Sequence, residues 1–162
     1  VVAGGVYIVK NTRNSSTVIA TNAITMVDLT GQTKEEVQEV IQLGTMLNPN
    51  FSKLFHIENL NPNETIYLYK ENNINKGFIH IQNGLDIIDL LNIIVKPEYQ
   101  NQGIGSVLLK YIIDNKQDKK IMLEVRSKNI NAIKLYQKYD FKIINIRKNY
   151  YKDDDAIIME RN

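Results

Sequence analysis

The chain has 162 residues, 43% of them hydrophobic, and a net charge of +2, which are the size and composition of one globular domain. So small a charge does not indicate a nucleic acid partner, and no apolar run approaches the roughly 18 residues of a membrane span. The absence of cysteine excludes disulfides and a cysteine nucleophile, and two histidines, His56 and His80, are too few for a histidine-rich metal site. We therefore expect a cytoplasmic protein that binds no metal, no nucleic acid and no membrane.

The first 24 residues are the hardest part of the chain to assign. Residues 5–11 and 16–29 have the composition of strands, but residues 1–24 fit equally well a leader, a tag or extra strands. We expect one domain over residues 25–162.

A helical pattern follows over residues 33–47. Thr33 and Glu36 have the spacing of a capping box, which predicts that the helix begins there. The spacing puts four apolar residues on one helical face, namely Val37, Val40, Ile41 and Met46. Residues 50–60 predict a second, shorter helix.

The hydrophobic period then changes to that of strands and later alternates between strands and helices. Residues 64–71 and 76–83 predict a hairpin around a turn at 72–77. Residues 85–95 are almost wholly apolar toward their end, as in a central strand buried on both faces. The later elements are a helix at 103–116, a strand at 119–125, a helix at 129–139 capped by Asn129, and strands at 141–151 and 155–161. This order predicts a mixed α/β (α+β) domain.

Two glycines one residue apart, Gly103 and Gly105, stand between an apolar strand and a helix. The start of a helix offers unpaired N–H groups to an anion, and missing side chains let a phosphate approach the backbone. Residues 100–106 are therefore a candidate pyrophosphate site, although two glycines in a tight turn would give the same pattern. A P-loop is excluded because Ser106 follows Gly105, and a Rossmann loop because residue 108 is leucine.

The segment Gln100-Asn101-Gln102-Gly103-Ile104-Gly105 resembles the Gln/Arg-x-x-Gly-x-Gly/Ala signature of the GNAT superfamily of N-acetyltransferases. Residues 123–161, with "LEVR", "SKN", "LY", "NYY" and "DAIIM", resemble above all its bacterial ribosomal-protein alanine N-acetyltransferase (RimI) family. The resemblance implies a GNAT fold, with a central, twisted, mostly antiparallel sheet of about six to seven strands and about four helices. It also implies acetyl-CoA as co-substrate, direct transfer to a protein N-terminal amine and a monomer or weak dimer.

The same resemblance assigns roles to particular residues. It makes Glu124 the base and Tyr136 the acid, and places Tyr150 and Tyr151 near the acceptor. The residues that it assigns to acetyl-CoA are Ile93, Ile94, Val95, Gln100, Asn101, Gln102, Gly103, Ile104, Gly105, Ser106, Asn129 and Tyr136.

Each of these roles has a plainer alternative in the residues themselves. Alternation puts Glu124 opposite the buried face of its strand, where a solvated or arginine-paired glutamate is also common. By its spacing Tyr136 is typical of a core aromatic residue, and the two adjacent tyrosines can simply anchor a loop. His56 and His80 are interpreted as structural.

Two further features have to be weighed beside the resemblance, and Asp140 bears on the position of the following strand rather than on the mechanism. Asp140 stands where the family usually has a glycine, at a position that often needs a positive φ. The acidic run 153–155 is typical of a solvated turn, although it could also neutralise an incoming ammonium group. The alternatives to a protein N-terminal acetyltransferase are a GNAT enzyme for a small amine or a lysine side chain, and a non-catalytic module that binds coenzyme A.

Overall fold

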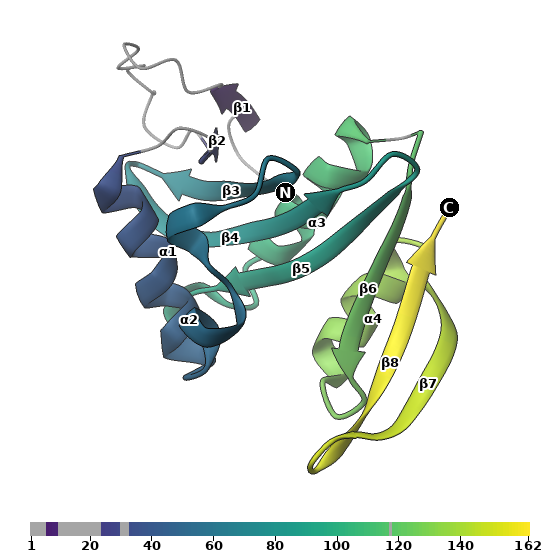
Figure 1. Ribbon diagram of the computed structural model, residues 1–162. Helices are drawn as coiled ribbons and strands as arrows, with labels where there is room; N and C mark the ends of the chain where they lie inside the picture. The colour runs from purple at the N-terminus through teal and green to yellow at the C-terminus, as the bar shows by residue number, and fades with distance from the viewer. Residues whose placement is uncertain (1–5, 10–23, 30–32, 117) are drawn as a thin grey trace.

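A computed structural model describes residues 6–9, 24–29, 33–116 and 118–162, which form one sheet of eight strands in the order β1-β2-β3-β4-β5-β6-β8-β7 (Figure 1). The strands are β1 (Val6–Val9), β2 (Ile24–Asp28), β3 (Glu64–Glu71), β4 (Ile74–Asn83), β5 (Ile87–Val95), β6 (Lys120–Arg126), β7 (Lys142–Tyr151) and β8 (Asp154–Arg161). The helices are α1 (Lys34–Leu47), α2 (Phe51–Leu54), α3 (Ile104–Asn115) and α4 (Ile130–Lys138), with short 3₁₀ turns η1 (Ile57–Asn59) and η2 (Pro97–Tyr99).

The sheet is mostly antiparallel. Only the pairs β1–β2 and β5–β6 are parallel among the described strands. This arrangement confirms the predicted fold class, and the eighth strand is β1, at the N-terminal edge. Residues 1–5 and 10–23 lie outside the described residues, so the interpretation of residues 1–24 stays a prediction.

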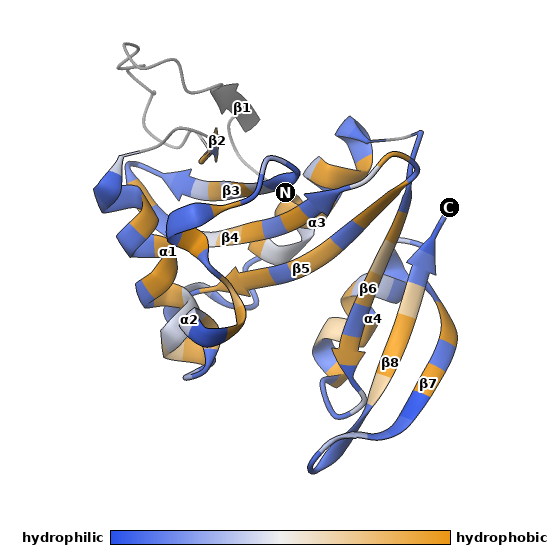
Figure 2. Ribbon diagram, in the orientation of Figure 1, coloured by the Kyte–Doolittle hydropathy of each residue, from blue (hydrophilic) through white to orange (hydrophobic). Residues whose placement is uncertain are grey.

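Helices cover both faces of the sheet, and each face has its own hydrophobic cluster. On one face α1 and α2 pack against Ile66, Leu68 and Phe78. On the other face α3 and α4 pack against Ile79, Ile81 and Leu123. Neighbouring residues of β4 therefore belong to opposite clusters, as the alternation of a strand requires. Figure 2 shows the hydrophobic residues that run along β4 and β5 between these two layers.

The helices and turns follow the sequence closely, with three corrections. Residues 50–60 do not form one helix, because α2 ends at Leu54 and η1 begins only at Ile57. The β3–β4 turn is shorter than predicted, because Asn72 and Asn73 both have positive φ (52° and 63°) and close a two-residue turn. Thr33 caps α1 by accepting a hydrogen bond from the Glu36 N–H. Met46 is 61% exposed and is not part of the buried helix face, since six residues from Val40 correspond to a rotation of about 240°.

The strand β5 pairs with β6 over only half of its length. The ladder runs from Ile87, opposite Lys120, to Leu90, opposite Leu123, and then the strands diverge (Figure 1). A register shift between β4 and β5 at the same place leaves Leu91 as an extra residue. Burial of β5 on both faces was therefore a wrong expectation: Leu91, Asn92 and Ile93 are only half-buried.

At the end of α4, Asp140 adopts the positive φ that this position often needs. Its φ is 68°, in the left-handed region, and the N–H groups of both Tyr139 and Phe141 donate to the Tyr136 carbonyl. Phe141 is then buried in the core, and β7 begins at Lys142. The aspartate thus takes the conformation that the family's glycine would take.

Replacing Asp140 by glycine tests this conformation. We expect Asp140→Gly to raise the free energy of unfolding by about 0.5–1 kcal/mol, because glycine adopts a positive φ without a steric cost. Urea unfolding measures the change. The control Asp114→Gly, within α3, should instead lower stability by about 1 kcal/mol. An equal loss in both variants would contradict the prediction.

Candidate active site

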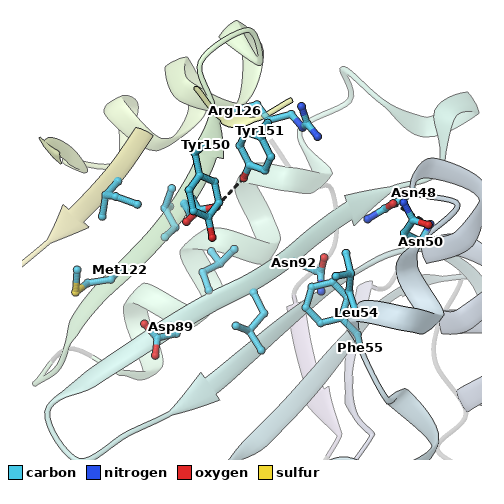
Figure 3. Close-up of a pocket in the computed structure, with 15 residues that line it drawn as sticks. Asn48, Asn50, Leu54, Phe55, Asp89, Asn92, Met122, Arg126, Tyr150 and Tyr151 are labelled. Carbon is cyan, nitrogen blue, oxygen red and sulfur yellow. Dashed lines mark hydrogen bonds between the residues drawn. The ribbon is translucent and has the colours of Figure 1, made fainter. Parts of the chain in front are cut away.

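A pocket of about 760 Å³ opens where β5 and β6 diverge (Figure 3). Its walls come from β5, β6, the end of β7, one residue of β8 and the segment around α2. The lining residues are Asn48, Asn50, Leu54, Phe55, Asp89, Leu90, Leu91, Asn92, Met122, Leu123, Glu124, Arg126, Tyr150, Tyr151 and Ile158. We call this the β5–β6 pocket.

Glu124 lies in the β5–β6 pocket because side chains alternate between the two faces of β6. Ile121, Leu123 and Val125 are buried in the core, so Glu124 points to the opposite face with its side chain 32% exposed. Its carboxylate accepts a 2.7 Å hydrogen bond from the Tyr151 hydroxyl, and Arg147 Nη1 lies 3.9 Å from its other oxygen. The carboxylate is thus partly paired and still open to the pocket.

The two adjacent tyrosines differ in their surroundings. Tyr150 is 54% exposed, whereas Tyr151 lies beneath the Arg126 guanidinium, 3.9 Å from the ring centre. Partial burial and the hydrogen bond to Glu124 raise the pKa of Tyr151 to about 12. Tyr151 therefore keeps its proton at neutral pH and remains a donor to Glu124.

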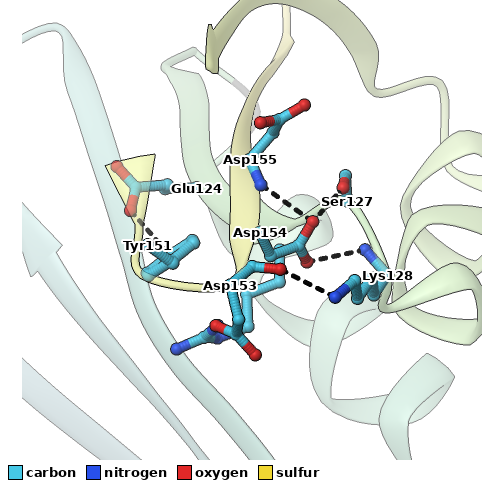
Figure 4. Close-up of polar contacts among 8 residues, drawn as sticks. Glu124, Ser127, Lys128, Tyr151, Asp153, Asp154 and Asp155 are labelled. Atoms are coloured by element: carbon cyan, nitrogen blue, oxygen red, sulfur yellow. Dashed lines mark hydrogen bonds and ion pairs between the residues drawn. The ribbon is translucent and has the colours of Figure 1, made fainter. Parts of the chain in front are cut away.

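The acidic run 153–155 is only in part the solvated turn that the sequence suggested, because Asp153 is exposed in the turn whereas Asp154 is buried. Asp154 is 9% exposed and accepts hydrogen bonds from the Ser127 hydroxyl and from the N–H groups of Lys128 and Asp155 (Figure 4). Asp153 pairs with Arg126 at 2.9 Å. These contacts fasten the β7–β8 turn to the β6–α4 loop and so hold Tyr151 beside Glu124. The carboxylates are occupied within the protein, which argues against the alternative of a site for an incoming ammonium group.

A second pocket, of about 450 Å³, lies at the start of α3. It contains every predicted coenzyme residue except the exposed Gln102. Those residues are Ile93, Ile94, Val95, Gln100, Asn101, Gly103, Ile104, Gly105, Ser106, Asn129 and Tyr136, and Leu47, Tyr99, Asn131, Ala132 and Leu135 complete the lining. We call this the α3 pocket.

The backbone of the α3 pocket presents N–H groups at its rim. Asn101 and Gly103 have φ values of 64° and 84°, and no side chain in the described residues caps α3. The first intrahelical bond runs from the Val107 N–H to the Gly103 carbonyl, so the N–H groups of the first turn point out of the helix. Gly103 is explained by its positive φ, and a Cβ there would meet no atom within 4 Å.

Three other predicted residues can be placed within this pocket. The Gln100 side chain donates to the Val95 carbonyl at 3.1 Å and so ties the loop to the end of β5. Asn129 caps α4 by accepting from the Ala132 N–H, as predicted. Tyr136 is buried against Phe141, and this burial raises the pKa of Tyr136 to about 12.

The two pockets adjoin along β5, the β5–β6 pocket on the side of the α2 segment and the α3 pocket on the side of α3 and α4. Leu90, Leu91 and Asn92 line the β5–β6 pocket, and the next three residues, Ile93–Val95, line the α3 pocket. Glu124 and Tyr136 thus line different pockets. Beyond Leu90 no ladder to β6 closes the sheet between them.

Asp89, Asn92 and the α1–α2 segment also line the β5–β6 pocket and were not predicted from the sequence. One polar residue, Asn92, inside the apolar run "LLNIIV" was a usable signal. In the described ranges we find no group of three or more metal-ligating side chains, and no helix there is long and apolar enough to span a bilayer.

Replacing Asp154 tests the role of its hydrogen bonds. Although burial acts the other way, hydrogen bonds from Ser127, Lys128 and Asp155 lower the pKa of Asp154. The carboxylate therefore stabilises the fold above its unfolded-state pKa of about 4, and this stabilisation is lost as the pH falls through the folded-state pKa. We expect Asp154→Asn to lower the urea midpoint at pH 7, and the deficit to shrink below pH 4. The exposed control Asp118→Asn should leave the urea midpoint unchanged both at pH 7 and below pH 4. An equal loss of the midpoint in Asp154→Asn at both pH values would contradict the prediction.

Comparison with known proteins places this arrangement in a family. The pattern of the acetyltransferase (GNAT) domain matches residues 62–143. The ribosomal protein bS18-alanine N-acetyltransferase of Escherichia coli (strain K12) is 44% identical over 82 residues, 46% of this chain and 55% of the relative, so the match spans about half of that relative's length. The enzyme of the same name from Haemophilus ducreyi is 36% identical over 70% of this chain and 91% of its own length.

Solved structures agree with these matches. The crystal structure of the E. coli ribosomal-protein-S18-alanine N-acetyltransferase superposes with a TM-score of 0.74 and 31% identity, over 85% of this chain and 92% of that one. A GNAT family acetyltransferase from Elizabethkingia anophelis, crystallised with acetyl-CoA bound, gives a TM-score of 0.71 and 28% identity, over 86% and 97%. The chain belongs to the GNAT acetyltransferase family.

Proposed function

We propose that this protein transfers the acetyl group of acetyl-CoA to the N-terminal α-amine of a protein, with a ribosomal protein that begins with alanine as the acceptor. The observation that carries the proposal is the meeting of two pockets along β5, one with the loop of the family signature and one with Glu124. The similar E. coli and H. ducreyi proteins, which are bS18-alanine N-acetyltransferases, support this choice of acceptor.

The α3 pocket has the donors that a coenzyme A pyrophosphate requires. The N–H groups of the first turn of α3 point out of the helix, and the positive end of its dipole favours an anion there. Gly103 and Gly105 have no side chain that would obstruct the rim. Bound acetyl-CoA supplies an activated thioester carbonyl, and the β5 backbone at Ile93–Val95, unpaired toward β6, offers N–H donors to the oxygen that becomes negative.

Glu124 is the proposed base. Its carboxylate removes a proton from the α-ammonium group, directly or through a water, so that the amine nitrogen can attack the thioester carbon. As the C–N bond forms and the C–S bond breaks, the nitrogen loses its second proton, which restores the proton donor, and the leaving thiolate takes up a proton. The buried Tyr136 hydroxyl, which is protonated at neutral pH, is the proposed donor. Transfer is direct, because the chain has no cysteine to carry the acetyl group.

Tyr150 and Tyr151 form the proposed wall for the acceptor peptide. Their rings stand edge to face at 5.3 Å, and the Asp153–155 contacts hold them in place. A wall of this kind suits an extended peptide chain better than a compact amine.

Acetyl transfer to defined peptides tests the proposal. The acceptors are peptides that differ only in their first residue, together with an N-terminally blocked peptide that has one lysine. We expect acetylation of the free α-amine, with peptides that begin with alanine among the good acceptors, read by mass spectrometry. Acetylation of the lysine alone would show that the acceptor is a lysine side chain and not the proposed N-terminal amine. Coenzyme A binding without any product would indicate a non-catalytic module.

The role of Glu124 predicts a specific kinetic defect. We expect Glu124→Gln to lower kcat about 100-fold at pH 7 while the affinity for acetyl-CoA stays unchanged, because only the proton acceptor is lost. Steady-state kinetics and calorimetry measure the two quantities. The matched control Glu58→Gln, an exposed glutamate in η1, should keep wild-type kcat. A Glu124→Gln enzyme with wild-type turnover would remove Glu124 from the mechanism.

The role of Tyr136 predicts a pH profile. Because its folded-state pKa is about 12, the hydroxyl stays protonated up to pH 10, and kcat should not fall over that range through Tyr136 ionisation. We expect Tyr136→Phe to lower kcat about tenfold or more at every pH from 6 to 10. The exposed Tyr150, replaced in the same way, should leave acetyl-CoA affinity unchanged. A Tyr136→Phe defect that appears only above pH 9 would contradict the proposal.

A further inference from the structure

A chain of three polar side chains crosses the sheet from β3 to the β5–β6 pocket. Glu64 Oε1 lies 3.1 Å from His80 Nε2, and His80 Nδ1 lies 3.2 Å from Asn92 Nδ2. His80 is fully buried, with the Phe55 ring edge-on at 5.6 Å. Asn92 is half-buried and lines the pocket (Figure 3). The proposed reaction does not involve these three side chains.

Hydrogen-bond chemistry fixes the direction of every bond in it. Glu64 as a carboxylate only accepts, and its second oxygen already takes the Asn61 N–H at 2.9 Å. His80 Nε2 must therefore be the protonated nitrogen. Burial lowers the pKa of His80, although Glu64 acts in the opposite direction, so the ring is neutral and Nδ1 has a free lone pair.

The amide of Asn92 then has only one satisfactory orientation. Its NH₂ group must face His80, because Nδ1 needs a donor. The carbonyl oxygen is consequently the end that is left for the pocket. A neutral acceptor held in this way is suited to a ligand with N–H donors and unsuited to an anion.

The bulge in β5 explains why Asn92 faces this pocket. Ile81 pairs with Leu90 and His80 pairs with Asn92, so Leu91 is the extra residue between them. In a regular strand Leu90 and Asn92 would share a face, and Asn92 would point into the core under α3. The extra residue turns Asn92 to the face of α2 and Glu124 instead, as bulges beside active sites commonly do.

We infer that the Asn92 carbonyl oxygen accepts a hydrogen bond from an N–H group at the start of the acceptor peptide. His80 and Glu64 act as positioning residues that keep the amide in the required orientation. This inference rests on the proposed function, and it assigns the acceptor a fixed neutral contact in addition to the Glu124 carboxylate.

Kinetics with the full chain test the contact. We expect Asn92→Ala to raise the KM for an alanine-start peptide about tenfold, the cost of one such hydrogen bond, with an unchanged KM for acetyl-CoA. Gln82→Ala, an exposed position two residues from His80 on β4, is the control and should match the wild type. An unchanged peptide KM in Asn92→Ala would overturn the inference and leave the proposed function intact.

A double mutant tests the positioning role. His80→Phe should also raise the peptide KM, and combining it with Asn92→Ala should add less than a further twofold, because both changes remove one contact. Effects that multiply would show that His80 does not act through Asn92. If His80→Phe fails to fold, as thermal unfolding would reveal, Asn92→Ala alone decides the contact.

A failure of the proposed function gives a different result. Calorimetric titration of the peptide into coenzyme A-loaded protein measures acceptor binding without turnover. If the wild type acetylates only the blocked lysine peptide, or nothing, the proposed acceptor or activity is wrong. Asn92→Ala is then compared with the wild type in the binding of whichever peptide binds, and equal affinities would overturn the role of Asn92.

Discussion

The divergence of β5 from β6 after the Leu90–Leu123 pair is the constraint on which the rest of the structure depends. Up to that pair the two strands share a parallel ladder, and beyond it the edge of each strand is left without its partner. Unpaired backbone groups are costly in a closed core, so a break of this kind persists where solvent or a ligand can reach them. Both pockets border this break, and β5 contributes Asp89–Asn92 to one of them and Ile93–Val95 to the other.

Two features of the strands place side chains beside the gap between β5 and β6. The extra residue Leu91 changes the face on which Asn92 lies, and the regular alternation of β6 puts Glu124 on that same face. On the opposite face the start of α3 and the buried Tyr136 approach from a different layer. A sheet with helices on both sides thus brings the start of α3, a carboxylate and a phenol to two pockets that adjoin along β5.

The sequence predicted the features that depend on neighbouring residues. Hydrophobic period located most elements, and Thr33, Asn129 and Asp140 took the capping and positive-φ positions expected of them. Features set by distant contacts were not predictable in this way. The Tyr151–Glu124 bond and the Asp154–Ser127 bond each join residues 27 positions apart, and neither partner's pattern indicates the other. The bulge at Leu91 could not be predicted either, because an apolar run has the same pattern with or without an extra residue.

The anchoring of the β7–β8 turn has a thermodynamic consequence for recognition. A surface loop that is ordered only when a ligand arrives must lose its conformational freedom at that moment, and this loss weakens the complex. Here the Asp154 carboxylate and the Arg126–Asp153 pair hold the turn to the neighbouring β6–α4 loop within the protein itself. The proposed acceptor wall is therefore preorganised, and the entropy of ordering it belongs to folding rather than to the binding of the proposed acceptor peptide.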